Sequence, residues 1–200
     1  MLLEGENIGF RYERNSWLFQ NLNISIESGE VVGLRGPSGY GKTTLGQILA
    51  GHQMPQEGQV TIDGQALPLK GYHPVQLVFQ HPERAVNPRW RIQRVLEEGG
   101  KPDSDLLSAL GIQKEWLKRS PHELSGGELQ RICIARALGN ETRFLIADEM
   151  TTMLDAITQA QIWQSVLEIA RARKLGLLVI SHDQHLIKRI CGRWISLSEH

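Results

Sequence analysis

The segment 36–43 limits the possible folds of this chain more than any other feature. It reads GPSGYGKT and fits the pattern GxxxxGK[ST]. Residues 31–34 before it are typical of a buried strand, and the residues after Gly41 are typical of a helix. Further short apolar runs alternate with helical stretches along the chain. Together they predict an α/β fold with a mainly parallel sheet.

Phosphate binding is the chemistry that this loop predicts. Its glycines let backbone N–H groups converge on phosphate oxygens, and the following helix presents its positive end to an anion. We expect Lys42 to reach the β- and γ-phosphates and the Thr43 hydroxyl to ligate Mg²⁺. The alternative, an ordinary glycine-rich turn, is disfavoured by the flanking strand and helix. The candidate phosphate-binding residues are Gly36, Ser38, Gly39, Gly41, Lys42, Thr43 and Thr44.

Two acids follow another buried strand. Residues 144–147 are apolar, and Asp148 and Glu149 come directly after them. Ligands of parallel sheets bind at the carboxyl ends of the strands. Asp148 is therefore expected to hold the metal, through water, and Glu149 to orient the attacking water as catalytic base. The alternative is that both acids only cap the next element, but the phosphate loop upstream favours hydrolysis.

The middle of the chain has a different character. From Gln80 to about Leu138 no convincing strand is visible, and four prolines divide amphipathic helical pieces (Pro82, Pro88, Pro102 and Pro121). We expect one domain over 1–200, with a core of 1–80 and 140–200 and an inserted helical subdomain of about 81–139. Strands are predicted at 22–26, 59–62, 75–79, 177–180 and 193–197, and helices at 129–138 and about 155–174. In the last helix Ile157, Ile162, Val166 and Ile169 have roughly helical spacing.

Composition excludes several classes of protein. The 22 basic and 22 acidic residues cancel, which argues against a broad nucleic-acid-binding face. Cys133 and Cys191 form no CxxC pair, so a structural zinc site or disulfide framework is not expected. Glu4 directly follows Met1, Leu2 and Leu3, and no stretch reaches the roughly 18 apolar residues of a membrane span. We expect a soluble protein whose membrane role, if any, comes through a partner.

A third motif lies in the helical region. Residues 124–128 read LSGGE and precede a predicted helix. Two glycines at a helix start expose backbone amides and so make a second anion site. One nucleotide needs only one phosphate cradle, so the second makes sense if it serves the nucleotide of a partner subunit. A simple N-cap by Ser125 is the alternative.

With these motifs on the page, the chain resembles the nucleotide-binding subunits of ATP-binding cassette (ABC) transporters. The matching segments are GPSGYGKTT (36–44), LSGGE (124–128), FLIADE (144–149) and ISHD (180–183). The resemblance implies a P-loop NTPase with a RecA-like core, an N-terminal antiparallel β subdomain and an inserted α-helical subdomain. It also implies two subunits, identical or not, that pack head to tail around two molecules of Mg·ATP. Membrane permease subunits are the implied partners, with a solute-binding protein in addition and no nucleic acid. The implied location is peripheral, at the cytoplasmic face of the membrane.

The resemblance also assigns roles to single residues. Gln80 matches the glutamine that senses the metal and the interface, and His182 the histidine that contacts the γ-phosphate. Tyr12 is our choice for the aromatic ring that stacks on adenine, with Phe10 and Trp17 as alternatives. The remaining implied nucleotide contacts are Ser125, Gly126 and Gly127 across the dimer, and Asp155 at the end of a cross-dimer loop.

One segment is similar to a particular branch of the family. Residues 79–90, FQHPERAVNPRW, are similar to the FQDP…NPR stretch of the di- and oligopeptide and nickel importers. We therefore expect import of a peptide or of nickel, and a docking groove for the membrane subunit at about 81–95. The alternative is that this stretch only shapes and packs a loop.

The chain departs from this branch in three places. His81 replaces the usual aspartate, and Met150 and Met153 replace the proline and alanine expected after Glu149. The chain ends at His200, where the peptide branch usually carries an extension, and this favours a minimal ATPase, one of two non-identical ATPases in its complex. The rival functions are a non-transport cassette ATPase of DNA repair or translation, a small-molecule phosphotransferase and an inactive nucleotide-binding subunit.

Overall fold

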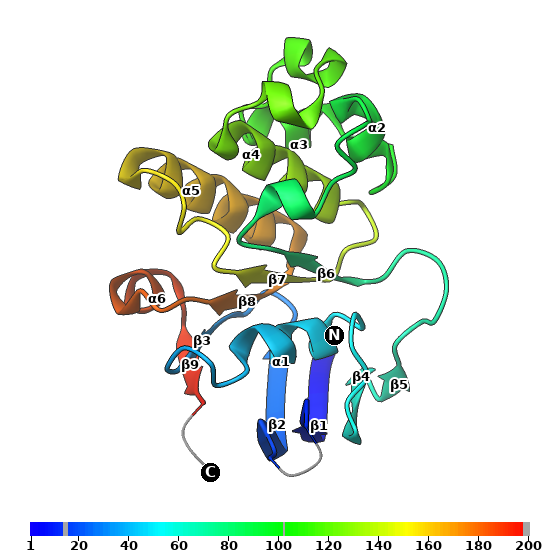
Figure 1. Cartoon of the computed structure of the whole chain (residues 1–200), viewed down its shortest axis with the longest axis vertical. Coiled ribbons are helices and arrows are strands. Elements are labelled where there is room, and N and C mark those ends of the chain that lie inside the picture. Colours follow the sequence, from blue (N-terminus) through cyan, green and yellow to red (C-terminus); the bar gives the residue numbers. More distant parts are fainter. Residues whose placement is uncertain (14–15, 102, 198–200) are drawn as a thin grey trace.

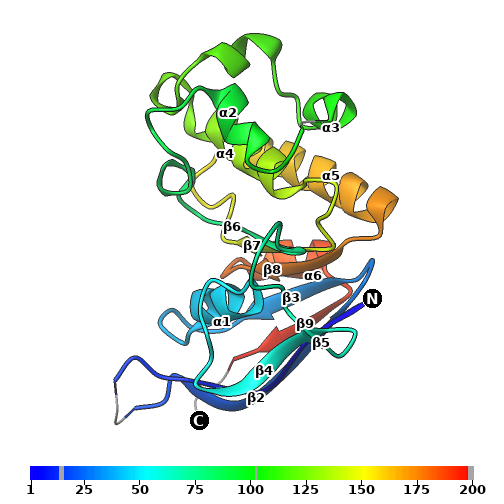
Figure 2. The same cartoon turned by 90° about the vertical axis from the view of Figure 1, so that its right-hand side faces the viewer.

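The computed structural model describes residues 1–13, 16–101 and 103–197. Pro102, one of the four prolines of the middle region, and His200, the last residue, lie outside these ranges. Two sheets and a group of helices are stacked along the long axis of the molecule (Figures 1 and 2).

The larger sheet has five strands, all parallel, in the order β6-β7-β8-β3-β9. The strands are β3 (Val31–Arg35), β6 (Val75–Val78), β7 (Phe144–Asp148), β8 (Gly176–Ile180) and β9 (Arg193–Ser196). The smaller sheet is antiparallel, in the order β2-β1-β4-β5. Its strands are β1 (Leu2–Phe10), β2 (Phe19–Glu27), β4 (Glu57–Ile62) and β5 (Gln65–Ala66).

The helices occupy two layers. Helix α1 (Lys42–Leu49) lies between the two sheets, while α2 (Ile92–Glu97), α3 (Ser104–Ala109), α4 (Gly126–Ala137) and α5 (Ala156–Arg173) lie beyond the far face of the parallel sheet (Figure 1). Helix α6 (Gln184–Ile190) joins β8 to β9. Short 3₁₀ turns complete the helical region: η1 (Pro82–Arg84), η2 (Lys114–Lys118) and η3 (Pro121–Glu123).

The parallel strands divide the interior into two cores. In β7, Leu145 and Ala147 pack into the core under α2, α4 and α5, whereas Phe144 and Ile146 pack into the core around α1. Successive side chains of a strand point to opposite faces, so a strand covered on both faces must be apolar throughout. The unbroken apolar runs in the sequence are therefore explained by burial of these strands on both faces of the sheet.

The model confirms the predicted α/β fold with a parallel sheet and an N-terminal antiparallel sheet. Within the described residues no strand lies between β6 and β7, as expected for a helical insertion. No pattern in the sequence predicts β1, β5 or α6. Strand β1 contains Gly5 and Gly9, which are poor strand formers, but it is held by pairing with both β2 and β4. Ile157 is not part of the buried face of α5, since 73% of it is exposed.

The strand order brings the ends of four segments together. Strands β6, β7, β8 and β3 are neighbours and run in the same direction, so their carboxyl ends meet at one edge of the sheet. Asp148 is the last residue of β7, and the phosphate loop, Gln80, Glu149 and His182 each come after the end of one of these strands. A site at this edge follows directly from the topology. In the described part of the chain, no helix is long and apolar enough to cross a membrane.

Candidate active site

A pocket of about 380 Å³ opens at this edge of the sheet. Its size is within the range of small-molecule sites. Every residue that lines it except Leu18 is expected at the site from the sequence motifs or the family resemblance. The lining residues are Tyr12, Leu18, Ser38, Gly39, Gly41, Lys42, Thr43, Thr44, Gln80, Asp148 and Glu149.

The phosphate loop forms the floor of this pocket. Gly41 has φ of 85°, and a Cβ there would lie 2.7 Å from Leu18 Cδ2, so only glycine fits. Nζ of Lys42 donates to the carbonyl oxygens of Gly36 and Pro37, each at 2.8 Å. The lysine is buried and curls over its own loop. Its charge is thereby held at the start of α1, where an anion is favoured.

Leu18 is the one lining residue that the sequence did not reveal. It contacts the loop from the antiparallel side and is partly buried against the core around α1. A single leucine before an apolar strand carries no signal of its own. Only the closeness of β2 to the phosphate loop gives it a place in the site.

Asp148 lies buried between the phosphate loop and Glu149. Burial raises the pKa of its carboxyl, and the charge of Glu149 adds to the rise, while a hydrogen bond with Thr43 and the charge of Lys42 oppose it. A buried carboxyl of this kind ionises more readily beside an additional cation. The Thr43 hydroxyl, the Asp148 carboxyl and the Gln80 amide therefore offer oxygen donors of the type that Mg²⁺ prefers.

Glu149 has an unusual backbone. Its φ is 48°, in the left-handed region that few residues other than glycine adopt. Its N–H donates to the Ile180 carbonyl at 3.0 Å, and its own carbonyl accepts from the Thr152 hydroxyl at 2.8 Å. Such strain persists where the surroundings fix the conformation, and it is common at active sites. Here it turns the carboxylate toward the pocket and toward β8.

His182 is held beside Glu149. Its Nδ1 lies 3.1 Å from Glu149 Oε1. The residues on either side of it are held in place: the Asp183 N–H donates to Ser181 Oγ, and the Asp183 side chain caps α6. The imidazole is otherwise mostly exposed, with 63% of its side chain accessible. His182 is not among the residues that line the pocket, and its contact with Glu149 connects it to the site.

The three aromatic candidates for adenine stacking differ in exposure. Tyr12 is 70% exposed and lines the pocket, and its hydroxyl lies 2.8 Å from Thr44 Oγ1. Phe10 is buried and packs edge-on against Tyr12, with ring centroids 5.0 Å apart. Trp17 does not line the pocket and has the Arg11 guanidinium over its ring. Of the three, Tyr12 has a ring face that a base can reach.

The LSGGE segment and Asp155 lie elsewhere. Within the described residues they do not line the pocket of the phosphate loop. Ser125 caps α4 through a capping box with Glu128, and Asp155 caps α5 by accepting from the Ile157 and Thr158 N–H groups. These two helix starts are close, since a Cβ on Gly127 would lie 3.2 Å from Thr158 Cγ2. The LSGGE segment and Asp155 thus form one surface, separate from the pocket of the phosphate loop.

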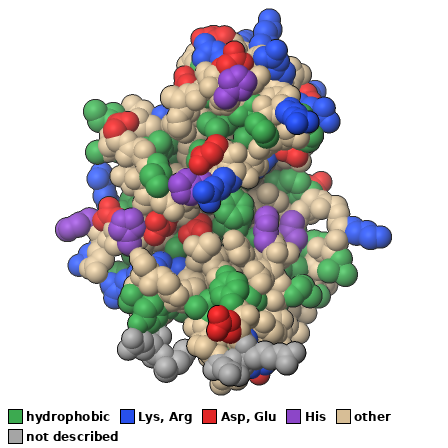
Figure 3. All heavy atoms as spheres, in the orientation of Figure 1, with side chains coloured by type: hydrophobic (Ala, Val, Ile, Leu, Met, Phe, Trp, Pro, Cys, Tyr) green, Lys and Arg blue, Asp and Glu red, His purple; other side chains and the backbone are tan. Residues whose placement is uncertain are grey.

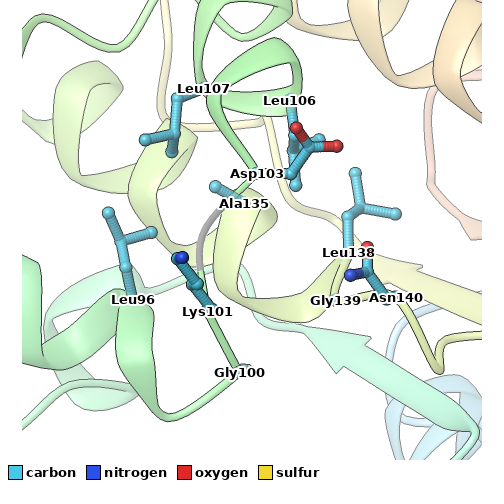
Figure 4. A pocket seen from close by; sticks show the side chains of 11 residues that line it. Leu96, Gly100, Lys101, Asp103, Leu106, Leu107, Ala135, Leu138, Gly139 and Asn140 are labelled. Carbon is cyan, nitrogen blue, oxygen red and sulfur yellow. The ribbon is translucent and has the colours of Figure 1, made fainter.

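The helical region holds a much smaller hollow. It has room for about 10 Å³ between α2, α3 and the end of α4, and four leucines are among the eleven residues that line it (Figure 4). Its one carboxylate, Asp103, already accepts from Arg173 at 3.2 Å. A space of this size holds about one water molecule. The pocket at the phosphate loop is the candidate active site because it gathers Lys42, Thr43, Asp148 and Glu149 in one place.

Comparison with protein families finds one match that covers most of the chain. Residues 19–152 match the family described as ABC transporter. The chain is 34% identical to "Oligopeptide transport ATP-binding protein OppF" of Streptococcus mutans, over 96% of this chain and 70% of that protein. It is 33% identical to "Nickel import system ATP-binding protein NikE" of Staphylococcus aureus, over 99% of this chain and 87% of that protein.

A longer relative and a solved structure extend this similarity. The chain is 37% identical to "Glutathione import ATP-binding protein GsiA" of Pectobacterium atrosepticum, over 92% of this chain but only 32% of the length of that relative. A dimeric ATP-binding cassette solved in a post-hydrolysis state with ADP and Pi has the same fold, with a TM-score of 0.79 and 24% identity over 98% of this chain and 94% of the other.

Proposed function

This chain belongs to the ABC transporter family, and from that premise we propose that it hydrolyses Mg·ATP at the phosphate loop to power import of a small solute through partner membrane subunits. Family membership makes it an ATP-binding ATPase domain. The observation that carries the assignment of the site is the single pocket shared by Lys42, Thr43, Gln80, Asp148 and Glu149.

We assign the nucleotide contacts within one subunit as follows. The loop amides and Lys42 bind the phosphates, and Lys42 exchanges its two carbonyl partners for phosphate oxygens. The Tyr12 ring stacks on adenine. Thr43, Asp148 and Gln80 would hold Mg²⁺ with the help of water, because Mg²⁺ usually keeps several of its water ligands. When bound there, the ion would supply positive charge beside the transferring phosphoryl group.

Glu149 and His182 carry the chemistry in this proposal. The glutamate accepts a hydrogen bond from the attacking water and aligns it with the γ-phosphate. The hydrogen bond from His182 holds the carboxylate in place, and the exposed part of the imidazole contacts the γ-phosphate. Both residues being present in one connected group supports an active ATPase over an inactive subunit.

A second subunit completes the site. The amides of Ser125, Gly126 and Gly127 stand at the positive end of α4 on a separate surface of the same chain. We assign them to the γ-phosphate of a nucleotide held by a partner ATPase, and Asp155 to the loop that crosses between the two. The partner is a second copy or a related chain. ATP then acts as glue between the subunits, and hydrolysis releases them.

Transport requires a surface for the membrane subunits. Residues 81–95 are rich in exposed arginines (Arg84, Arg89, Arg91 and Arg94), although the whole chain is neutral. Figure 3 shows basic side chains gathered at the helical end of the molecule. We assign this segment to docking of a permease, with peripheral attachment to the membrane as the consequence. The names of the relatives favour a peptide or nickel as the solute, and they give no support to a role in DNA repair or translation.

Two substitutions test the proposal in the purified protein. Glu149→Gln should lower kcat at least ~100-fold while ATP affinity stays within about twofold, because it removes the base but not the phosphate contacts. Lys42→Ala should weaken ATP binding ~10- to 100-fold by removing a charge-assisted contact. Lys70→Ala, at an exposed lysine away from the pocket, is the control. Normal turnover in Glu149→Gln would refute the assignment of the base.

A further inference from the structure

Gln130 is a buried polar residue that the mechanism above does not use. It lies on α4, five residues after the Ser125 cap, and is only 1% exposed. Its Nε2 donates to the Phe79 carbonyl at 3.2 Å, across the boundary between the helical region and the parallel sheet. Its Oε1 is the one buried side-chain nitrogen or oxygen atom without a partner in the described part of the chain.

The carbonyl that Gln130 holds belongs to the residue before Gln80. One helical turn further along α4, Cys133 Sγ contacts the Pro82 carbonyl at 3.7 Å. Side chains three residues apart lie on the same face of a helix. This face of α4 therefore holds the segment 79–82 on both sides of Gln80, which lines the pocket with Thr43 and Asp148.

The LSGGE segment lies at the N-terminal end of the same helix. The capping box between Ser125 and Glu128 fixes this end, with the Ser125 N–H donating to Glu128 Oε2 at 2.7 Å. Gln130 is only about 7.5 Å further along the helix axis. A displacement of the LSGGE segment is thus passed to the Phe79 carbonyl through one short, hydrogen-bonded piece of helix.

We propose that Gln130 is a positioning residue for Gln80, which makes the placement of the Gln80 amide depend on the helix that carries the LSGGE segment. The inference rests on the proposed role of Gln80 as a metal ligand. Buried amide oxygens nearly always have a partner, so the unpaired Oε1 disfavours the present arrangement. The Gln130 Oε1 atom is thus free to accept a hydrogen bond from residues 79–82 when Gln80 moves onto a bound metal ion.

The test is the Mg²⁺ dependence of ATP hydrolysis by the purified protein. Gln130→Met keeps the length of the side chain and the helix but cannot hydrogen bond to the Phe79 carbonyl. We expect the Mg²⁺ concentration for half-maximal hydrolysis to rise at least threefold, while ATP affinity in EDTA stays within twofold. Gln130→Asn, which is too short to reach the carbonyl, should shift the same quantity if the methionine variant does not fold.

Two comparisons separate positioning from mere packing. Gln80→Ala should raise the Mg²⁺ requirement, and adding Gln130→Met to it should raise it no further, because both changes act on one contact. Ile134→Val removes a buried methylene from the same helix and should change neither Mg²⁺ dependence nor metal-free affinity.

The outcomes distinguish this inference from the proposed function. Suppose that Gln80→Ala alters the Mg²⁺ requirement while Gln130→Met and Gln130→Asn leave it normal. That result would overturn the positioning role of Gln130 and leave the proposed function intact. A shift in Ile134→Val as large as that in Gln130→Met would also overturn the positioning role. Absence of Mg²⁺-dependent hydrolysis in the unmodified protein would instead refute the proposed function and, with it, the basis of this inference.

Discussion

Nδ1 of His182 lies 3.1 Å from Oε1 of Glu149, although 33 residues separate them in the chain. They follow the adjacent strands β8 and β7, which pair in parallel with Asp148 opposite Ile180. The backbone hydrogen bond from Glu149 to Ile180 fixes the glutamate in its left-handed conformation at the same point. The position of the proposed base is therefore set jointly by two strands.

Because the two side chains form one unit, their substitutions should not add. His182→Ala should lower kcat by ~10- to 1,000-fold, since the base loses its alignment. In the Glu149→Gln background the same change should lower kcat by less than about threefold, because residues that act together are non-additive. Steady-state phosphate release from the four proteins measures this coupling. Equal fold losses in both backgrounds would show independent roles.

The arginine-rich segment 81–95 provides a test of docking. Arg84 is exposed and lies outside the pocket, so Arg84→Glu should leave the ATPase activity of the isolated protein within about twofold. Transport by the complex reconstituted in vesicles should fall at least ~10-fold, because the surface charge of the interface is reversed. Arg189→Glu, at an exposed position on α6, is the matched control. Parallel loss of isolated ATPase activity and of folding in Arg84→Glu would contradict docking.

Trp90 belongs to the same segment but is partly buried and lies under the Arg94 guanidinium, 4.0 Å from its ring centroid. It is a less clean probe of docking than Arg84, because its replacement also removes packing.

Thr151 holds the loop between Glu149 and α5. Its buried Oγ1 accepts from Trp163 Nε1 at 3.0 Å and from Gln159 Nε2 at 2.9 Å. Thr151→Val leaves the buried indole N–H unpaired and should cost about 1–3 kcal/mol in the free energy of unfolding. For a chain of this size the melting temperature should fall by roughly 2–10 °C in a calorimetric scan. Thr61→Val, at a buried strand position where valine is favoured, should have little effect.

Glu30 should make the stability of the fold depend on pH in the acid range. Burial acts to raise the pKa of its carboxyl, but hydrogen bonds from Arg193 and the Glu27 N–H, with the charge of Arg193, hold the pKa below its usual 4.5. A carboxyl whose pKa is lower in the folded state stabilises the protein above its unfolded pKa. This contribution should be lost as the pH falls below about 4.5 and through the folded pKa.

The measurement is an NMR titration of the Glu30 carboxyl together with unfolding curves at several pH values. Arg193→Met should move the pKa of Glu30 upward and weaken this part of the acid dependence. The contribution is modest, because the side chains of Arg193 and Glu30 remain 42% and 26% exposed. An unchanged Glu30 titration in Arg193→Met would contradict the assigned cause.

Local patterns were sufficient for the phosphate loop, the acidic pair and the buried strands. The loop requires glycines and a lysine at fixed spacing within eight residues, and a strand covered on both faces requires an unbroken apolar run. These constraints act over a few residues, so they are visible in the chain itself. Weak elements were missed, because the glycines of β1 disfavour a strand and only pairing on both sides stabilises it.

The sequence by itself determined the position of the phosphate-loop motif and of the buried strands of the parallel sheet. Only the tertiary structure decided that His182 meets Glu149, that Phe10 is buried while Tyr12 is open, and that Gln130 holds the Phe79 carbonyl. Each of these contacts joins or separates residues through the order of the strands and the packing of helices on them. Spacing along the chain carries no information about that order, because parallel strands that are neighbours in the sheet are joined by long crossovers.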